Sequence, residues 1–179
     1  MAVSGPFIMR CDSGADRATH IDISADFLEA AERETARRGH SDRVRFVLGD
    51  FVQLASSVDP ADIVTLDRVI CCYPDMESLV TRAAQRARRI VGAVYPRASW
   101  WVRAGVRLTN ALMRVRRCHF RVYLHSPLAI DAAFSGQGLS RSRTSRTLIW
   151  EVVVYTRPMD TTRALPRDPS QESSAEIDE

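Results

Sequence analysis

The sequence predicts an α/β fold with a mostly parallel sheet that ends in an antiparallel hairpin. Residues 62–67 and 90–95 are nearly continuous apolar runs, which is typical of parallel strands buried on both faces. A helical apolar pattern over residues 75–89 lies between them, so that strand and helix alternate. Near the C-terminus, residues 139–146 and 147–156 indicate two antiparallel strands, because apolar residues alternate along the second of them.

The first part of the chain adds two further strands and a helix. Residues 1–16 are rich in turn-forming residues, and we expect an irregular segment there. Residues 17–23 predict a short strand, and Ser24 is a suitable N-cap for the helix that follows. Gly39 ends this helix, and residues 43–49 alternate in the manner of a strand nearer the sheet edge.

The second part adds two helices and a tail. Residues 98–117 predict an amphipathic helix with arginines largely off its apolar face, and we expect that face to pack in the core. The alternatives are a lid over an amphipathic or anionic substrate and a contact with a membrane surface. Residues 127–135 predict a shorter helix. The domain is therefore expected to span 17–156, followed by a disordered acidic tail over 157–179.

Composition excludes several classes of protein. The 25 basic residues are all arginine, which we attribute to codon bias, so no nucleic-acid partner is expected at a net charge of +3. No apolar run approaches the ~20 residues of a membrane span, and residues 1–9 do not resemble a secretory signal. The four cysteines have no zinc-site spacing, and we expect no metal site and a cytoplasmic protein with reduced thiols.

Three of the predicted strands end in an acid, and this is the most informative feature of the chain. Asp22, Asp50 and Asp67 each follow an apolar or alternating run, and Gly49 precedes the second of them. A carboxylate at the carboxyl end of a parallel strand is well placed to accept hydrogen bonds from ribose hydroxyls. The pattern therefore predicts a nucleotide-binding edge of the sheet. Asp22 and Asp50 also have a purely local interpretation, since acids often begin helices and turns.

These runs resemble the class I S-adenosylmethionine-dependent methyltransferases. The segments that carry the resemblance are His20-Ile21-Asp22-Ile23-Ser24, Val44-Arg45-Phe46-Val47-Leu48-Gly49-Asp50-Phe51, Ala61-Asp62-Ile63-Val64-Thr65-Leu66-Asp67-Arg68 and Leu148-Ile149-Trp150-Glu151-Val152-Val153-Val154. They follow the family's order and cover roughly residues 15–156. The resemblance implies a Rossmann-like methyltransferase sheet, with S-adenosyl-L-methionine as cofactor and a small molecule as methyl acceptor.

The resemblance also implies a role for each site residue. Asp22 would hold the ribose hydroxyls, and Ile23 would pack on the adenine ring. Asp50 would accept from the adenine amine, with Gly49 and Phe51 shaping the pocket. The pair Asp67 and Arg68 would lie near the methionine end of the cofactor.

The loop after the third acid would lie beside the transferred methyl group. Tyr73 is the candidate catalytic residue there, either orienting a substrate oxygen or acting as an acid or base. Cys71 and Cys72 are adjacent, and in an extended segment they would point to opposite sides. We interpret both as small packing residues, because free cysteine is usually buried.

One part of the family pattern is missing from the sequence. A strand, a glycine-rich turn and a helix should precede the strand that ends at Asp22, and residues 1–16 are too few to supply them. Without this first strand, the strands ending at Asp22 and Asp67 should each have an edge without a partner, which favours self-association. We expect a truncated N-terminus or an alternative start.

The predicted function is therefore S-adenosylmethionine-dependent methyl transfer, impaired if the missing turn is essential. A first alternative is a catalytically inactive remnant of the fold that serves as a binding module. A second is a nicotinamide-dependent oxidoreductase, because Asp22 after a strand also suits that cofactor. A peripheral membrane contact stays open as an additional partner interaction.

Overall fold

The computed structural model describes residues 15–118 and 120–158. The elements in chain order are β1 (Ala18–Asp22), α2 (Ala25–Arg37), β2 (Val44–Leu48), α3 (Phe51–Leu54), η1 (Ala55–Ser57), β3 (Ala61–Asp67), η2 (Ile70–Cys72), α4 (Met76–Arg86), β4 (Ala87–Pro96), α5 (Trp100–Val115), α6 (Pro127–Ser135), β5 (Ser140–Arg146) and β6 (Trp150–Thr156). The predicted irregular segment and acidic tail lie outside the described residues, apart from 15–16 and 157–158.

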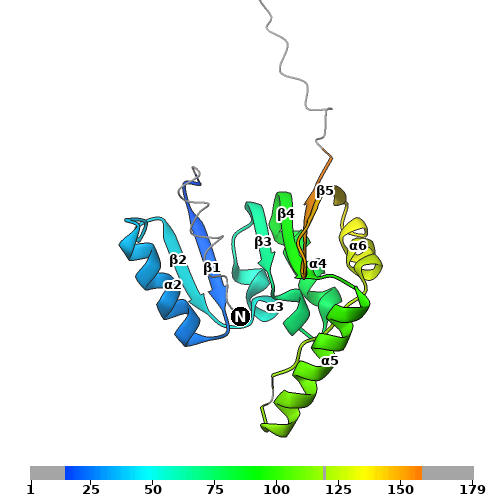
Figure 1. The fold of residues 1–179 in the computed structure, drawn as a ribbon. Helices are drawn as coiled ribbons and strands as arrows, with labels where there is room; N and C mark the ends of the chain where they lie inside the picture. The colour runs from blue at the N-terminus through cyan, green and yellow to red at the C-terminus, as the bar shows by residue number, and fades with distance from the viewer. Residues whose placement is uncertain (1–14, 119, 159–179) are drawn as a thin grey trace, which may run out of the picture.

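The described strands form two sheets. β1 and β2 pair in parallel, and the larger sheet has the order β3-β4-β6-β5. Within it β3 and β4 are parallel, whereas β6 runs antiparallel to both β4 and β5. This arrangement confirms the predicted fold class. In the described ranges no strand pairs with the second edge of β1 or of β3, and Figure 1 shows these two strands as neighbours in separate sheets.

The helices begin where the sequence provides capping side chains. Ser24 Oγ accepts from the backbone N–H of Phe27 at the start of α2. Asp75 Oδ1 accepts from the N–H of Ser78 at 3.1 Å and begins α4. α4 then ends at Arg86, earlier than the predicted limit of residue 89, because the chain becomes extended and enters β4.

The main core lies on one face of the larger sheet. α4 and α6 pack on this face against alternate residues of β4 and β6, and its largest fully buried members are Tyr95, Tyr155 and Phe134. The prediction that β3 and β4 are buried on both faces is wrong for the described structure. Ile63 is 45% exposed, and Val94 is only half-buried. The reason is that both packed helices belong to the same face of the sheet.

α5 also differs from its prediction. The helix leaves the body of the molecule, as Figure 1 shows, and Val102 is its one fully buried residue. Trp100 and Val115 are each 80% exposed, and Leu108 is 72% exposed. The expectation that the apolar face of this helix packs in the core is therefore wrong, because α5 extends past the end of the sheet and has no described partner for that face.

A short helix that the sequence did not indicate connects the two sheets. α3 follows β2 directly, and its residues Phe51 and Val52 pack against the core of the larger sheet. From the other side, Arg86 on α4 donates to the carbonyl oxygen of Val58 at 3.2 Å. The strand pair β1–β2 is thus tied to the larger sheet through the segment that joins β2 to β3.

Candidate nucleotide-binding site

The carboxyl ends of β1 and β2 meet at one edge of the smaller sheet. Asp22 pairs with Leu48 in the parallel register, and the N–H of Gly49 donates to the carbonyl oxygen of Asp22 at 2.9 Å. The structure therefore brings together the first two predicted acidic positions, Asp22 and Asp50, as the strand pattern required.

Asp22 is both a strand-end acid and the organiser of the next turn. Its Oδ1 accepts from the N–H of Ser24 at 2.8 Å, and the residue is 1% exposed. The local interpretation of this acid is thus realised in the structure. Ile23, the next residue, is 67% exposed and presents an apolar side chain at the same edge. An exposed isoleucine beside a strand-end acid suits a flat, apolar ring system such as a base.

Gly49 occupies a conformation that other residues rarely adopt. Its φ is +151°, and a Cβ built there would lie 2.6 Å from Leu54 Cδ1. The absence of a side chain allows the chain to turn directly from β2 into α3. This turn places Asp50 at the N-cap of α3, where Oδ1 accepts from the N–H of Val52 at 2.9 Å.

The second oxygen of the Asp50 carboxylate accepts a hydrogen bond from Tyr73. The Tyr73 hydroxyl donates to Asp50 Oδ2 at 3.0 Å across 23 residues of sequence, so the candidate catalytic residue and the candidate adenine acceptor are in contact. Burial, followed by this hydrogen bond, raises the pKa of Tyr73 to about 12. The hydroxyl is therefore protonated at neutral pH and serves as a hydrogen-bond donor, and the general-base role considered from the sequence is disfavoured.

The backbone of Tyr73 is contacted by a histidine, His125, that was not expected there from the sequence. A ring nitrogen of His125, Nε2, lies 2.9 Å from the Tyr73 carbonyl oxygen. The two residues are 52 positions apart, so no local pattern could indicate the contact. The backbone N–H of Tyr123 also donates to the carbonyl of Cys71. The segment before α6 therefore lies against the loop that follows β3 and is hydrogen-bonded to it.

The third acid, at the end of β3, is held by its neighbour. Asp67 is buried, and the Arg68 guanidinium contacts both carboxylate oxygens at 3.3 Å. Arg68 adopts a φ of 56°, a left-handed conformation that is uncommon for a residue with a side chain. Its guanidinium also lies 5.8 Å from the ring centroid of Trp150, in cation–π range. Because Trp150 pairs with Pro96, the last residue of β4, this contact places the Arg68 guanidinium at the carboxyl end of that strand.

The two cysteines of the following loop lie on the same side, contrary to the expectation from an extended segment. They belong to the single turn η2, and their Sγ atoms are 3.5 Å apart, both thiols being free. The contact with Cys71, reinforced by burial, raises the pKa of the Cys72 thiol. A protonated Cys72 is a poor nucleophile, which agrees with its interpretation as a packing residue.

The described part of the chain shows no cluster of three or more His, Cys, Asp or Glu residues that could hold a metal ion. Within the same residues, no helix combines the length and the apolar character that crossing a bilayer requires. Two surface cavities of about 390 and 480 Å³ lie away from the strand-end acids, one beside α5 and one on α4.

Comparisons with known proteins identify the fold and find a methyltransferase domain in part of the chain. Residues 4–90 match the family model of a methyltransferase domain. This match agrees with the resemblance to the class I S-adenosylmethionine-dependent methyltransferases that the strand-end motifs carry. No curated protein matches the sequence. The resemblance stated from the strand-end motifs is thereby confirmed.

Solved methyltransferase structures share the fold at low identity. Magnesium protoporphyrin IX methyltransferase from Synechocystis PCC 6803, with bound SAH, superposes with a TM-score of 0.68 at 18% identity over 85% of this chain and 68% of that chain. An O-methyltransferase family protein from Burkholderia thailandensis superposes with a TM-score of 0.64 at 14% identity, over 79% of this chain and 43% of that chain. An O-methyltransferase family 2 protein from Planctomyces limnophilus, in complex with apigenin, superposes with a TM-score of 0.62 at 15% identity, over 79% of this chain and 43% of that chain. The chain thus spans less than half the length of the latter two.

Proposed function

We propose that this methyltransferase-family chain binds S-adenosyl-L-methionine at the strand-end acids and transfers its methyl group to a small-molecule acceptor. The observation that carries the proposal is the convergence of Asp22 and Gly49–Asp50 at one edge of β1 and β2, joined by the 2.9 Å backbone hydrogen bond. Of the solved structures with this fold, one holds SAH and another holds SAM.

The residues at this edge fit the adenosine half of the cofactor. The Asp22 carboxylate would accept from the ribose hydroxyls, and the exposed Ile23 side chain would cover one face of the adenine. Asp50 keeps acceptor capacity on Oδ2 beside the Tyr73 hydroxyl, which suits an exocyclic amine. Gly49 and Phe51 would shape the wall of this pocket, since the former has no side chain and the latter is half-buried.

On the methionine side, Asp67 and Arg68 are the candidates at the end of β3. When bound, the cofactor supplies an electrophilic methyl group on a sulfonium sulfur. The buried, arginine-paired Asp67 carboxylate would place negative charge near that cation. Because the Tyr73 proton is donated to Asp50 and its pKa of about 12 keeps it in place, Tyr73 would orient a hydroxyl acceptor by accepting a hydrogen bond on its phenolic oxygen. Methyl transfer then depends mainly on alignment of the reacting atoms.

The second candidate function, a binding module without catalysis, is favoured by two observations. Asp22 is 1% exposed in this conformation, and within the described residues β1 and β3 belong to different sheets. A chain of this kind would retain the fold while binding the cofactor weakly or not at all. We further propose the cytoplasm as its location, in keeping with the free thiols of Cys71 and Cys72.

Calorimetric titration with S-adenosylhomocysteine separates the two candidates. We expect micromolar binding by the full chain and a loss of at least about tenfold in Asp22→Ala and in Asp50→Ala, since each removes a charged acceptor. Asp59→Ala is the matched control, because Asp59 is an exposed acid in the segment before β3. A folded chain that binds nothing would reject the enzymatic proposal and support the binding module.

A further inference from the structure

One face of α5 is an exposed apolar strip on a helix that extends from the body of the molecule (Figure 1). Leu108, Leu112 and Val115 recur at intervals of four and three residues, so that they align along the helix. Their exposed fractions are 72%, 48% and 80%, and Trp100 at the first turn is 80% exposed. The opposite side, which includes the buried Val102, faces the protein. We call the exposed side, with Arg117, Cys118, Phe120 and Arg121 after the helix, the α5 surface.

A row of arginines runs along α5, roughly a third of a turn round the helix from the apolar strip. Arg103, Arg107 and Arg114 are separated by four and seven residues, which places them on one line of the helix. All three side chains are exposed, and within the described residues none of them forms an ion pair. The α5 surface thus combines exposed apolar groups with fixed positive charge.

The charge of this region is not balanced by neighbours in sequence. Residues 78–130 contain eleven arginines and no aspartate or glutamate, although the whole chain has a net charge of only +3. The acids are therefore concentrated in the rest of the chain. Six of the eleven arginines, from Arg103 to Arg121, lie in α5 or within six residues of its end, and such a concentration of charge produces a positive field there.

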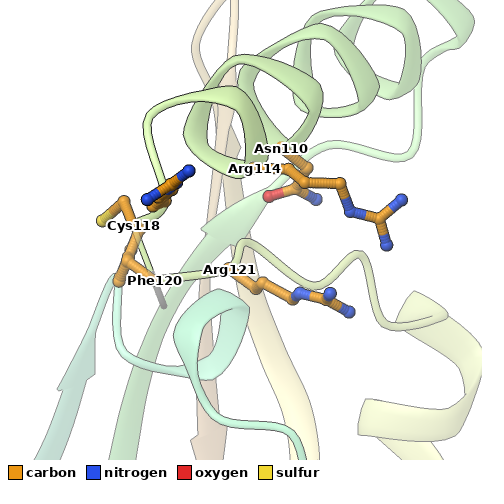
Figure 2. A pocket seen from close by; sticks show the side chains of 6 residues that line it. Asn110, Arg114, Cys118, Phe120 and Arg121 are labelled. Carbon is orange, nitrogen blue, oxygen red and sulfur yellow. The ribbon is translucent and has the colours of Figure 1, made fainter.

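The end of α5 adds a cavity with basic walls. Asn110 clamps the following loop, since its Nδ2 donates to the Val122 carbonyl at 2.8 Å and its Oδ1 accepts from the Val122 N–H at 2.9 Å. The resulting cavity of about 390 Å³ is lined by Asn110, Arg114, Arg117, Cys118, Phe120 and Arg121. Figure 2 shows Arg114 and Arg121 reaching to the same side of it. Guanidinium groups of this kind suit an organic phosphate.

We propose that the α5 surface docks the protein on a bilayer that contains anionic phospholipids. The apolar strip would enter the boundary between headgroups and acyl chains, and the arginine row would lie among the phosphates. A helix of 16 residues is about 24 Å long, too short to cross the bilayer, so that it would lie in the membrane plane. Trp100 at its first turn suits the interfacial level.

Two other occupants fit the α5 surface less well. A nucleic acid would use the arginines, but its phosphates would leave Leu108, Leu112 and Val115 in water. A second copy of this chain would cover the apolar strip, but it would bring two uncompensated arginine rows together. A lipid surface satisfies both features of α5 at once, because it offers acyl chains and negative charge in adjacent layers.

Flotation of the full chain with vesicles tests the proposal. The probes are phosphatidylcholine vesicles with and without phosphatidylglycerol, and the variants are R103Q/R107Q/R114Q and L108S/L112S/V115S. Each arginine near an anionic surface contributes about fivefold to the partition coefficient, so the charge variant should lose roughly a hundredfold. We expect the apolar variant to lose binding as well, and the emission of Trp100 to shift to the blue on vesicles when Trp101 and Trp150 are replaced by phenylalanine.

The matched control removes the same charge elsewhere. Arg17, Arg45 and Arg143 are exposed, directly before β1, on β2 and on β5, and R17Q/R45Q/R143Q should retain binding within about threefold, because distant charges are screened. Equal binding to both kinds of vesicle, or an equal loss in the control, would overturn the proposal. Release of the protein from vesicles by duplex DNA at an equal phosphate concentration would also overturn it. So would a concentration-dependent dimer that L108S/L112S/V115S abolishes, in a protein that does not bind either kind of vesicle. Thermal melting of each variant establishes that it is folded.

Discussion

The hydrogen bond between Tyr73 and Asp50 is the contact whose removal tests the site most directly. It links the loop after β3 with the start of α3, and therefore joins the two sheets. A neutral donor to a buried carboxylate contributes about 1.5–3 kcal/mol. Both residues are half-buried here and water competes for the bond, so we expect Tyr73→Phe to lower the free energy of unfolding by about 1 kcal/mol.

Urea unfolding followed by far-UV circular dichroism measures this loss. With a slope of about 2 kcal/mol per molar urea, the midpoint should fall by about 0.5 M. Tyr123→Phe is the matched control, since no described group hydrogen-bonds its hydroxyl, and it should change stability by less than about 0.5 kcal/mol. In a double-mutant cycle with Asp50→Ala, a coupling energy near zero would refute the reasoning.

The same contact predicts a pH dependence. The pKa of Tyr73 in the folded chain is raised to about 12 from an ordinary value of 10, by burial and by Asp50. Its contribution to stability is therefore complete below pH 10 and is lost as the pH rises from 10 to 12, where a phenolate would face a carboxylate. The absorbance at 295 nm should show one tyrosine titrating near pH 12 in the wild type and absent in Tyr73→Phe. Ionisation of that tyrosine near pH 10 would contradict the assigned cause.

Three further substitutions have outcomes that the structure determines. Gly49→Ala should lower the free energy of unfolding in urea by about 1–3 kcal/mol, because Gly49 has a φ of +151° and an added Cβ would lie 2.6 Å from a methyl of Leu54. Its control is Gly105→Ala in α5, where an added Cβ meets open space, and this change should raise the free energy of unfolding by up to about 1 kcal/mol. Arg157→Ala should lower the free energy of unfolding by about 2–4 kcal/mol, since its guanidinium donates to three backbone carbonyls near the ends of α4 and α6. Its control is Arg143→Ala on the exposed strand β5, which should change the free energy of unfolding by less than about 0.5 kcal/mol. Phe134→Ala should cost about 3–5 kcal/mol, because its ring is fully buried and stacks on another ring at 4.1 Å, and a loss under 1 kcal/mol in thermal or urea melts would contradict the described core.

Much of the fold follows from local pattern. The strands ending at Asp22 and Asp67 and the helix over 127–135 agree with the apolar periodicity that predicted them, because each element buries a face along a short stretch of chain. The convergence of Asp22 with Asp50 was equally predictable, since adjacent parallel strands end at the same edge of a sheet. Their assigned roles toward the cofactor stay predictions.

Contacts between distant segments could not be predicted in this way. The sequence offers no sign that Tyr73 donates to Asp50, or that His125 holds the Tyr73 backbone, because these pairs are 23 and 52 residues apart. The short helix α3 was also missed, as four residues are too few to establish a periodicity. Arg157, placed by the sequence in the tail, packs onto the domain through carbonyls 20 to 73 residues away.

By itself the sequence determined the order of strands and helices, the acids at the strand ends and the family to which they point. Hydrophobic periodicity and capping act over a few residues, so they can be read along the chain. Only the tertiary structure decided which apolar faces are covered. α5 has the same amphipathic pattern as a core helix, yet its apolar strip is exposed, because burial depends on what the rest of the chain places against a face and not on the face itself.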